Sequence, residues 1–290
     1  MMTPAWWGVV AAIGWGGSDL IGRITARELG AVGAMWGLSV TGALLAGLLY
    51  IFFPHQFPHH IQDWLWLAGT SAVALLAPIL FYQGLTLGPM ALVAPIAAAY
   101  PVWVVAVALL QGFHPGALAW VAMALVALGT IIVGRTAPAD PDETLGADPA
   151  NRKRAIWFAG LTSVGFAITL IAGAHTAALV GSITTLAATR LTGVFMIGVA
   201  RPWRGRPGFR RPSMLGLLLL QGLLDNTAFI AIYLGSQHGG AGVTAVGSSG
   251  FMVVAVLLAA LVLKERPGRR CLAGAAAVFA GIAFLAAHGP

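Results

Sequence analysis

Residues 31–53, AVGAMWGLSVTGALLAGLLYIFF, decide the fold, because these 23 consecutive residues contain no charged side chain. A helix of about 20 apolar residues is long enough to cross the hydrocarbon core of a bilayer. The rest of the chain has the same character, since 59% of its 290 residues are hydrophobic and only 9% are charged. Ordinary soluble domains carry about 25% charged residues. The sequence is therefore that of an integral membrane protein.

Similar apolar segments recur along the whole chain, separated by charges, prolines and polar clusters. Each is long enough for one transmembrane helix, so the fold class that we predict is an all-α polytopic membrane protein with ten spans. The predicted spans are residues 5–22, 31–53, 64–87, 90–111, 116–134, 155–173, 182–200, 213–235, 240–263 and 269–287.

The basic residues indicate the orientation of these spans. Of the 16 Lys and Arg residues, 15 lie in the loops after the first, fifth, seventh and ninth spans, whereas the loops after the second, fourth, sixth and eighth carry none. Loops rich in Lys and Arg stay in the cytoplasm, so we expect both termini to lie outside. Because Arg outnumbers Lys 14 to 2, a ratio typical of GC-rich bacteria, we expect a bacterial inner membrane.

The two halves of the chain resemble each other at an offset of about 150 residues. Gly14 corresponds to Gly165, and the segment Tyr82–Gly84 corresponds to Tyr233–Gly235. Each half has five spans, an odd number, so the second half enters the membrane from the opposite side. We therefore predict two inverted five-helix repeats around a central cavity near the bilayer midplane. The predicted units are a first repeat over 1–135, a polar cytoplasmic linker over 136–154 and a second repeat over 155–290.

Several segments resemble the drug/metabolite transporter superfamily. They are Trp6–Gly8 with Gly14–Ser18, the turn Gly88–Pro95, and the step Lys264–Pro267 into the last span. Within this superfamily the chain is similar to the ten-helix EamA-type exporters, and most similar to amino-acid exporters of the YddG kind. The resemblance implies export through a cavity lined by the third, fourth, eighth and ninth helices. The first half departs from the pattern, because Phe113–Gly116 stands where the second half has its glutamate step.

Two charged residues lie near the middle of predicted spans, namely Arg190 and Asp225. A charge at this depth costs about 2.5–3.5 kcal/mol on insertion scales, so it usually marks a functional site. Three interpretations remain open: an ion pair that holds two helices together, a substrate-carboxylate anchor at Arg190, and a proton-coupling acid at Asp225. Asp19, near the end of the first span, is expected to pair with Arg23 four residues later.

Polar and aromatic residues of the cavity-lining spans are further candidates. Tyr and Trp combine apolar surface with a hydrogen-bonding group, and a proline in a span leaves a backbone carbonyl free. Aromatic residues also form interfacial belts, and small hydroxyl residues also pack helices together, so those interpretations stay open. The cavity candidates are Tyr82, Gln83, Tyr100, Trp103, Asn226, Tyr233, Thr244, Ser248 and Ser249, and the candidates for helix breaks or gates are Pro78, Pro95 and Pro101.

Residue types that bind metals or perform covalent chemistry are sparse. Cys271 is the single cysteine, and three histidines, His55, His59 and His60, share one predicted external loop. We predict solvated loop residues there, with no metal site and no cofactor. The sequence also lacks a Gly-rich phosphate loop and a nucleophile motif, so we predict that the protein is not an enzyme and does not bind nucleic acid.

Together these features predict an inner-membrane transporter that exports small metabolites by alternating access. Amino acids, including aromatic and apolar ones, are the favoured solutes, and we expect facilitated or weakly coupled movement instead of dedicated proton antiport. The predicted partners are this solute and the lipid bilayer, and a single chain is expected to suffice. A multidrug or other metabolite exporter is the alternative within the superfamily. A membrane-embedded enzyme, an assembly protein or a channel would belong to other classes.

Overall fold

The computed structural model describes residues 3–53, 56–87, 93, 96–112, 114, 116–136, 149–200, 212–237, 240–262 and 268–288. These residues form helices and short connections, with no strand among them, so the predicted all-α fold is confirmed. The helices are α1 (Pro4–Leu29), α2 (Ala31–Phe52), α3 (Ile61–Leu87), α5 (Tyr100–Leu110), α6 (Ala117–Thr136), α7 (Pro149–Val180), α8 (Ser182–Ala200), α9 (Pro212–Gly235), α10 (Ala241–Ser248), α11 (Phe251–Val262) and α12 (Arg269–His288).

The described helices follow the predicted spans in outline, and two of the differences concern α7 and the ninth span. Five of the described helices, α2, α3, α7, α8 and α9, are long and apolar enough to cross a membrane individually. Helix α7 already begins at Pro149, inside the predicted linker, of which residues 137–148 lie outside the described part of the chain. The ninth predicted span is not continuous, because Ser249 and Gly250 form a turn between α10 and α11. At this turn the Gly250 amide donates to the Gly247 carbonyl three residues back, which interrupts the α-helical pattern.

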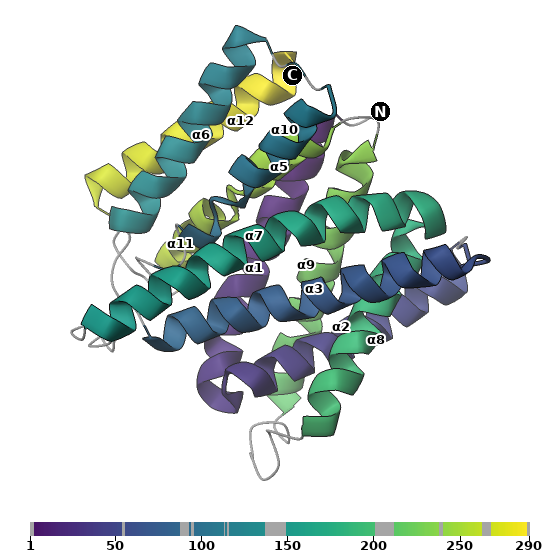
Figure 1. The fold of residues 1–290 in the computed structure, drawn as a ribbon. Coiled ribbons are helices and arrows are strands. Elements are labelled where there is room, and N and C mark those ends of the chain that lie inside the picture. The colour runs from purple at the N-terminus through teal and green to yellow at the C-terminus, as the bar shows by residue number, and fades with distance from the viewer. Residues whose placement is uncertain are drawn as a thin grey trace.

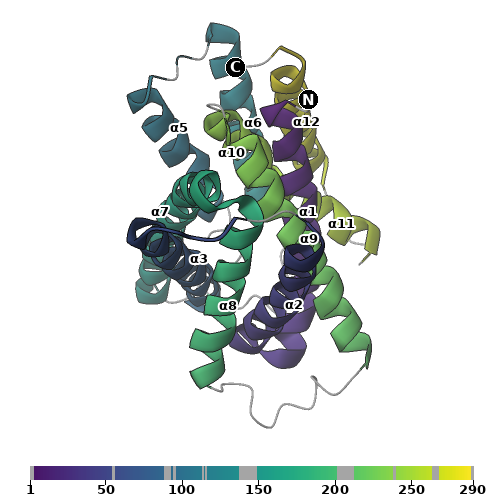
Figure 2. The same cartoon turned by 90° about the vertical axis from the view of Figure 1, so that its right-hand side faces the viewer.

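The two halves of the chain are interlocked. Helix α1, the first of its half, packs along α9, the third helix of the other half, and α7 packs along α3 in the corresponding way. Two further extensive contacts join corresponding helices, α2 with α8 and α6 with α12, and these two pairs lie at opposite ends of the molecule (Figure 1). Turning the view by 90° keeps α3 beside α7 and α1 beside α9 (Figure 2). Exchanging the halves maps this set of contacts onto itself, as an inverted repeat requires.

Two buried hydrogen bonds repeat under the same exchange. The Thr25 hydroxyl lies 3.2 Å from Oε1 of Gln221 where α1 meets α9, and the Thr70 and Thr176 hydroxyls lie 2.8 Å apart where α3 meets α7. Adding 151 to Thr25 gives Thr176, and adding 151 to Thr70 gives Gln221. These two hydrogen bonds therefore give an offset of 151 residues between the halves, which agrees with the value of about 150 from sequence comparison.

Glycines allow the helices to approach closely where α6 crosses α12. A Cβ atom on Gly129 would lie 2.7 Å from the Gly274 carbonyl oxygen, and one on Gly274 would lie 2.9 Å from the Gly129 carbonyl oxygen. In a bilayer, helices associate largely through such close packing, because lipid and side chains are equally apolar. The close approach of α6 and α12 therefore requires glycine at both positions.

We expect Gly129→Ala to destabilise the protein by about 1–3 kcal/mol, because the added methyl group must push α12 away from α6. Gly69→Ala is the matched control, since a Cβ atom at Gly69 would meet nothing within 4 Å. Thermal unfolding in detergent, followed by tryptophan fluorescence, measures both. Equal midpoints for the two variants would contradict the close crossing.

Candidate substrate site

Arg190 and Asp225 form an ion pair inside the molecule. Arg190 projects from α8 and Asp225 from α9, and a terminal guanidinium nitrogen of Arg190 contacts a carboxylate oxygen of Asp225. The two side chains are only 12% and 11% exposed, respectively. Because a lone charge at this depth is costly, each residue offsets the charge of the other.

Neighbouring groups hold the arginine in position. Nε of Arg190 donates to Oδ1 of Asn226 at 2.9 Å, and Nδ2 of Asn226 donates to the Gly42 carbonyl at 2.8 Å. A Cβ atom on Gly42 would lie 2.9 Å from Cδ of Arg190, so α2 leaves room for the arginine by carrying a glycine there. Three helices, α2, α8 and α9, thus meet around one guanidinium group.

Aromatic rings flank the ion pair on the side of α1. The Arg190 guanidinium lies 4.9 Å from the centre of the Phe229 ring, close enough for a cation–π interaction. The Trp15 ring on α1 meets Phe229 edge-on, with 5.3 Å between ring centres. The charged pair is therefore bordered by an apolar, aromatic wall. Sequence analysis missed Phe229 and Trp15, although Phe229 follows Asp225 at the four-residue spacing that places two residues on one helix face.

The position related to the ion pair by the repeat carries no charge. Adding 151 to Ser39 gives Arg190, and adding 151 to Gly42 gives Gly193. Gly193 packs against the Ser39 hydroxyl as Gly42 packs against Arg190. Ser39 donates to the Met35 carbonyl of its own helix, at 2.9 Å. The charged site thus belongs to one side of an otherwise symmetric arrangement.

A second carboxylate lies near the ion pair. Asp19 of α1 is half-buried and interacts electrostatically with Asp225. Its predicted partner, Arg23, has a side chain outside the described part of the structure. Sequence analysis placed Asp19 at a helix end and missed its proximity to Asp225, because nothing in one sequence shows that α1 packs along α9.

The hydroxyl residues of α10 and of the turn after it mainly bond to the backbone. Ser248 donates to the Ala245 carbonyl at 2.9 Å, Thr244 to the Gly235 carbonyl at 2.7 Å, and Ser249 to the Val246 carbonyl at 2.7 Å. The Tyr100 hydroxyl lies 2.7 Å from Oγ of Ser248. The Tyr100 hydroxyl also lies 3.4 Å from the Ala245 carbonyl oxygen. All four side chains are buried, and these bonds tie α5 to the broken helix α10–α11.

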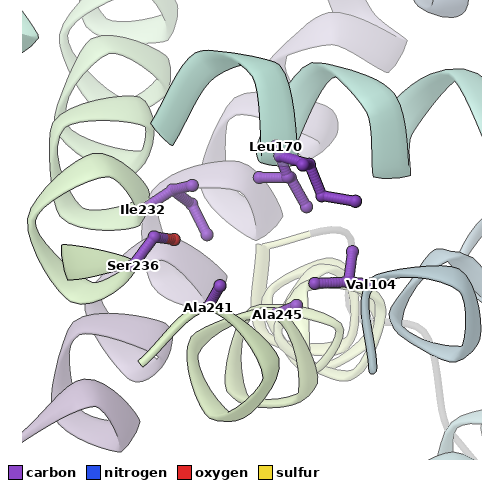
Figure 3. A pocket seen from close by; sticks show the side chains of 7 residues that line it. Val104, Leu170, Ile232, Ser236, Ala241 and Ala245 are labelled. Carbon is purple, nitrogen blue, oxygen red and sulfur yellow. The ribbon is translucent and has the colours of Figure 1, made fainter. Parts of the chain in front are cut away.

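A small cavity lies between α5, α7, α9 and α10 (Figure 3). Its volume is about 10 Å³, close to the smallest space that can hold one water molecule. Six of its seven lining residues are apolar, and Ser236 supplies the single hydroxyl among the seven. The described helices are therefore packed closely here, and a solute of amino-acid size needs them to separate. The lining residues are Val104, Leu170, Ile171, Ile232, Ser236, Ala241 and Ala245.

The other predicted site residues lie apart from the ion pair or outside the described structure. Gln83 is exposed on α3, and Trp103 on α5 is 49% exposed. Pro78 lies inside α3, and Pro101 lies in the first turn of α5, where a missing amide proton costs little. The Tyr82 side chain and the whole of Pro95 lie outside the described residues.

The histidine-containing loop supports a helix start. The backbone amides of His59 and His60 both donate to Oδ2 of Asp63 at 3.1 Å, in the first turn of α3. His55 lies outside the described residues. In the part of the chain that the structure describes, no group of three or more His, Cys, Asp or Glu side chains could hold a metal ion.

The fold and this site together define a class of protein. A helical membrane protein with inverted halves and a charged site between them is built like a carrier. The model of the EamA-like transporter family matches residues 2–135 and again residues 153–287, so the chain belongs to this family. It is a membrane transporter of the drug/metabolite transporter superfamily.

One solved structure, titled only "Crystal structure of protein", supports the fold. It matches with a TM-score of 0.76, covering 98% of this chain and 96% of its own chain, at 16% sequence identity. At this identity the likeness concerns the fold alone. A search of curated protein sequences found no match.

Removal of one member of the ion pair should be costly. We expect Arg190→Met or Asp225→Leu alone to reduce the free energy of unfolding by about 3–5 kcal/mol, because each leaves a buried charge uncompensated. The double variant Arg190→Met/Asp225→Leu should recover most of this loss. Unfolding in detergent, measured as a double-mutant cycle, tests the coupling. Additive losses would show that the two charges do not stabilise each other.

Proposed function

We propose that this transporter exports amino acids across a bacterial inner membrane, with Arg190 and Asp225 as the binding site for the zwitterionic head group. The observation that carries the proposal is the pairing of these opposite charges, side by side and bordered by aromatic rings, in the interior where the halves meet. The family establishes transport, and this site is the basis for proposing the solute.

The chemistry of the ion pair matches that of an amino acid. A guanidinium group offers paired N–H donors to a planar carboxylate, and a carboxylate accepts hydrogen bonds from an ammonium group. A zwitterion can therefore insert between Arg190 and Asp225, and each charge then exchanges one partner for another. No charge is left unpaired at any stage, which keeps the desolvation cost of opening the pair low.

The surroundings of the pair favour apolar or aromatic side chains in the solute. Phe229 and Trp15 provide an apolar wall beside the charges, the usual composition of a small-molecule site with a few fixed polar groups. A purely hydrophobic drug would leave Arg190 and Asp225 without a role. For this reason we place multidrug export second.

Alternating access would follow from the interlocked helix pairs. Because α3 packs along α7 and α1 along α9, each pair can move as one body, and the polar site lies close to the boundary between them. Asp225 is already neutralised by Arg190, which favours facilitated movement without an accompanying proton. One chain supplies every residue of the site, so we propose that the monomer is functional.

Uptake into liposomes containing the purified protein tests the proposal. We expect saturable uptake of radiolabelled phenylalanine, competed by other zwitterionic amino acids. The double variant Arg190→Met/Asp225→Leu should be folded and yet at least about tenfold less active, since hydrogen bonds to charged groups contribute about 1.5–3 kcal/mol.

The matched control for this experiment is Arg152→Met, which removes a positive charge from an exposed position at the start of α7. Its uptake should equal that of the wild type. If no amino acid is taken up above the level of empty liposomes, the amino-acid proposal is wrong, and drugs or other metabolites become the leading solutes.

The proposed orientation, with both termini outside, can be tested with single cysteines. Cys271 is buried, and replacing it with Ala provides a cysteine-free background. On this background Gly116→Cys, before α6, should react with a membrane-impermeant maleimide in intact cells. Gly268→Cys, before α12, should react only after the membrane is opened. The reverse pattern would invert the proposed topology.

A further inference from the structure

Tyr233 carries a buried polar group that the ion pair does not use. Its side chain is fully buried, and its hydroxyl has no hydrogen-bond partner among the residues that the structure describes. A buried hydroxyl without a partner is costly, so such groups usually meet water or a ligand. Tyr100 is also fully buried, and it differs because its hydroxyl bonds to Ser248.

Tyr233 lies on the same face of α9 as the ion pair. Asp225, Phe229 and Tyr233 follow one another at four-residue spacing, which aligns them along one side of a helix. The Phe229 ring is 4.9 Å from the Arg190 guanidinium carbon and 6.0 Å from the centre of the Tyr233 ring. Along this face of α9 the charged pair is therefore followed by the Phe229 ring and then by the Tyr233 hydroxyl.

Helix α7 covers this hydroxyl at close range. A Cβ atom on Gly173 would lie 2.7 Å from Cε1 and 3.2 Å from the hydroxyl oxygen of Tyr233. The small cavity in Figure 3 lies at the same junction, lined by Leu170 of α7 and Ile232 of α9. Helix α7 is joined mainly to α3, and α9 mainly to α1. A separation of these two pairs would therefore uncover the Tyr233 hydroxyl.

We propose that the Tyr233 hydroxyl recognises the far end of the solute, and that it selects amino acids whose long side chains end in a hydrogen-bonding group. This inference rests on the proposed function, in which Arg190 and Asp225 hold the head group. Tyr233 lies eight residues after Asp225, about 12 Å along the helix axis, and its side chain leans back toward Asp225. An aromatic side chain spans such a gap, whereas that of alanine or serine does not.

The chemistry gives this contact a clear preference. A site built to hydrogen-bond a hydroxyl disfavours the analogue that lacks it, because the polar group of the protein then stays unpaired. Tyrosine and phenylalanine differ only in such a hydroxyl, at the end of an aromatic ring. We therefore expect tyrosine to bind more tightly than phenylalanine.

Competition against radiolabelled phenylalanine uptake in proteoliposomes tests the inference, with unlabelled tyrosine and phenylalanine as the competitors. In the wild type, tyrosine should inhibit at a concentration up to about tenfold lower than phenylalanine, as one neutral hydrogen bond allows. In Tyr233→Phe this preference should vanish, while inhibition by phenylalanine changes little.

Tyr100→Phe is the matched control, because it removes a buried hydroxyl that already has a partner. It should lower the thermal unfolding midpoint and keep the tyrosine preference, whereas Tyr233→Phe should lose the preference without lowering the midpoint. An unchanged preference in Tyr233→Phe, with phenylalanine uptake intact, overturns this inference and leaves the proposed function standing. Failure of both amino acids to compete in the wild type overturns the two together.

Discussion

The absence of water in the bilayer core is the constraint on which this structure depends. Each backbone polar group there must find its partner inside its own segment, which leaves helices as the building units. Helices in lipid then associate through close contact, and the repeat provides it twice. Gly14 of α1 packs against Ala228 of α9, and Gly165 of α7 packs against Ala77 of α3. Each glycine allows a helix of one half to pack closely against a helix of the other half.

The ion pair breaks the symmetry that these contacts establish. An ideal two-fold repeat would give its two exchanged arrangements equal energies. Here Arg190 faces Gly42 on one side, while Ser39 faces Gly193 on the other. The charges bridge α8 to α9, and the described residues form no equivalent ion pair from α2 to α3. An ion pair that is present on only one side lowers the free energy of one of the two arrangements. A solute that inserts between Arg190 and Asp225 can reduce this difference in free energy.

Much of the fold could be predicted because spans in lipid depend on hydropathy, which one sequence displays directly. The prominence of Arg190 and Asp225 could be predicted for the same reason, since charges inside spans are rare. The residues that surround this ion pair could not be predicted from the sequence. Phe229 and Gly42 are ordinary residues of apolar spans, and only the packing of α2 and α8 against α9 gives them a role. The break at Ser249 and Gly250 was missed because neither residue is a proline, and hydropathy stays high on both sides.

Because helices of one half pack against helices of the other, the order in which the helices are synthesised affects folding. Helices α1 and α3 leave the ribosome long before α9 and α7, against which they pack. Helices α1 and α3 are therefore inserted before their partners exist, and they reach these contacts only after α9 and α7 have been inserted. Folding of this kind depends on contacts between residues far apart in sequence, which makes it slow and exposes it to wrong partners. A truncated chain would keep the packing faces of α1 and α3 and lack the helices α9 and α7 that cover them.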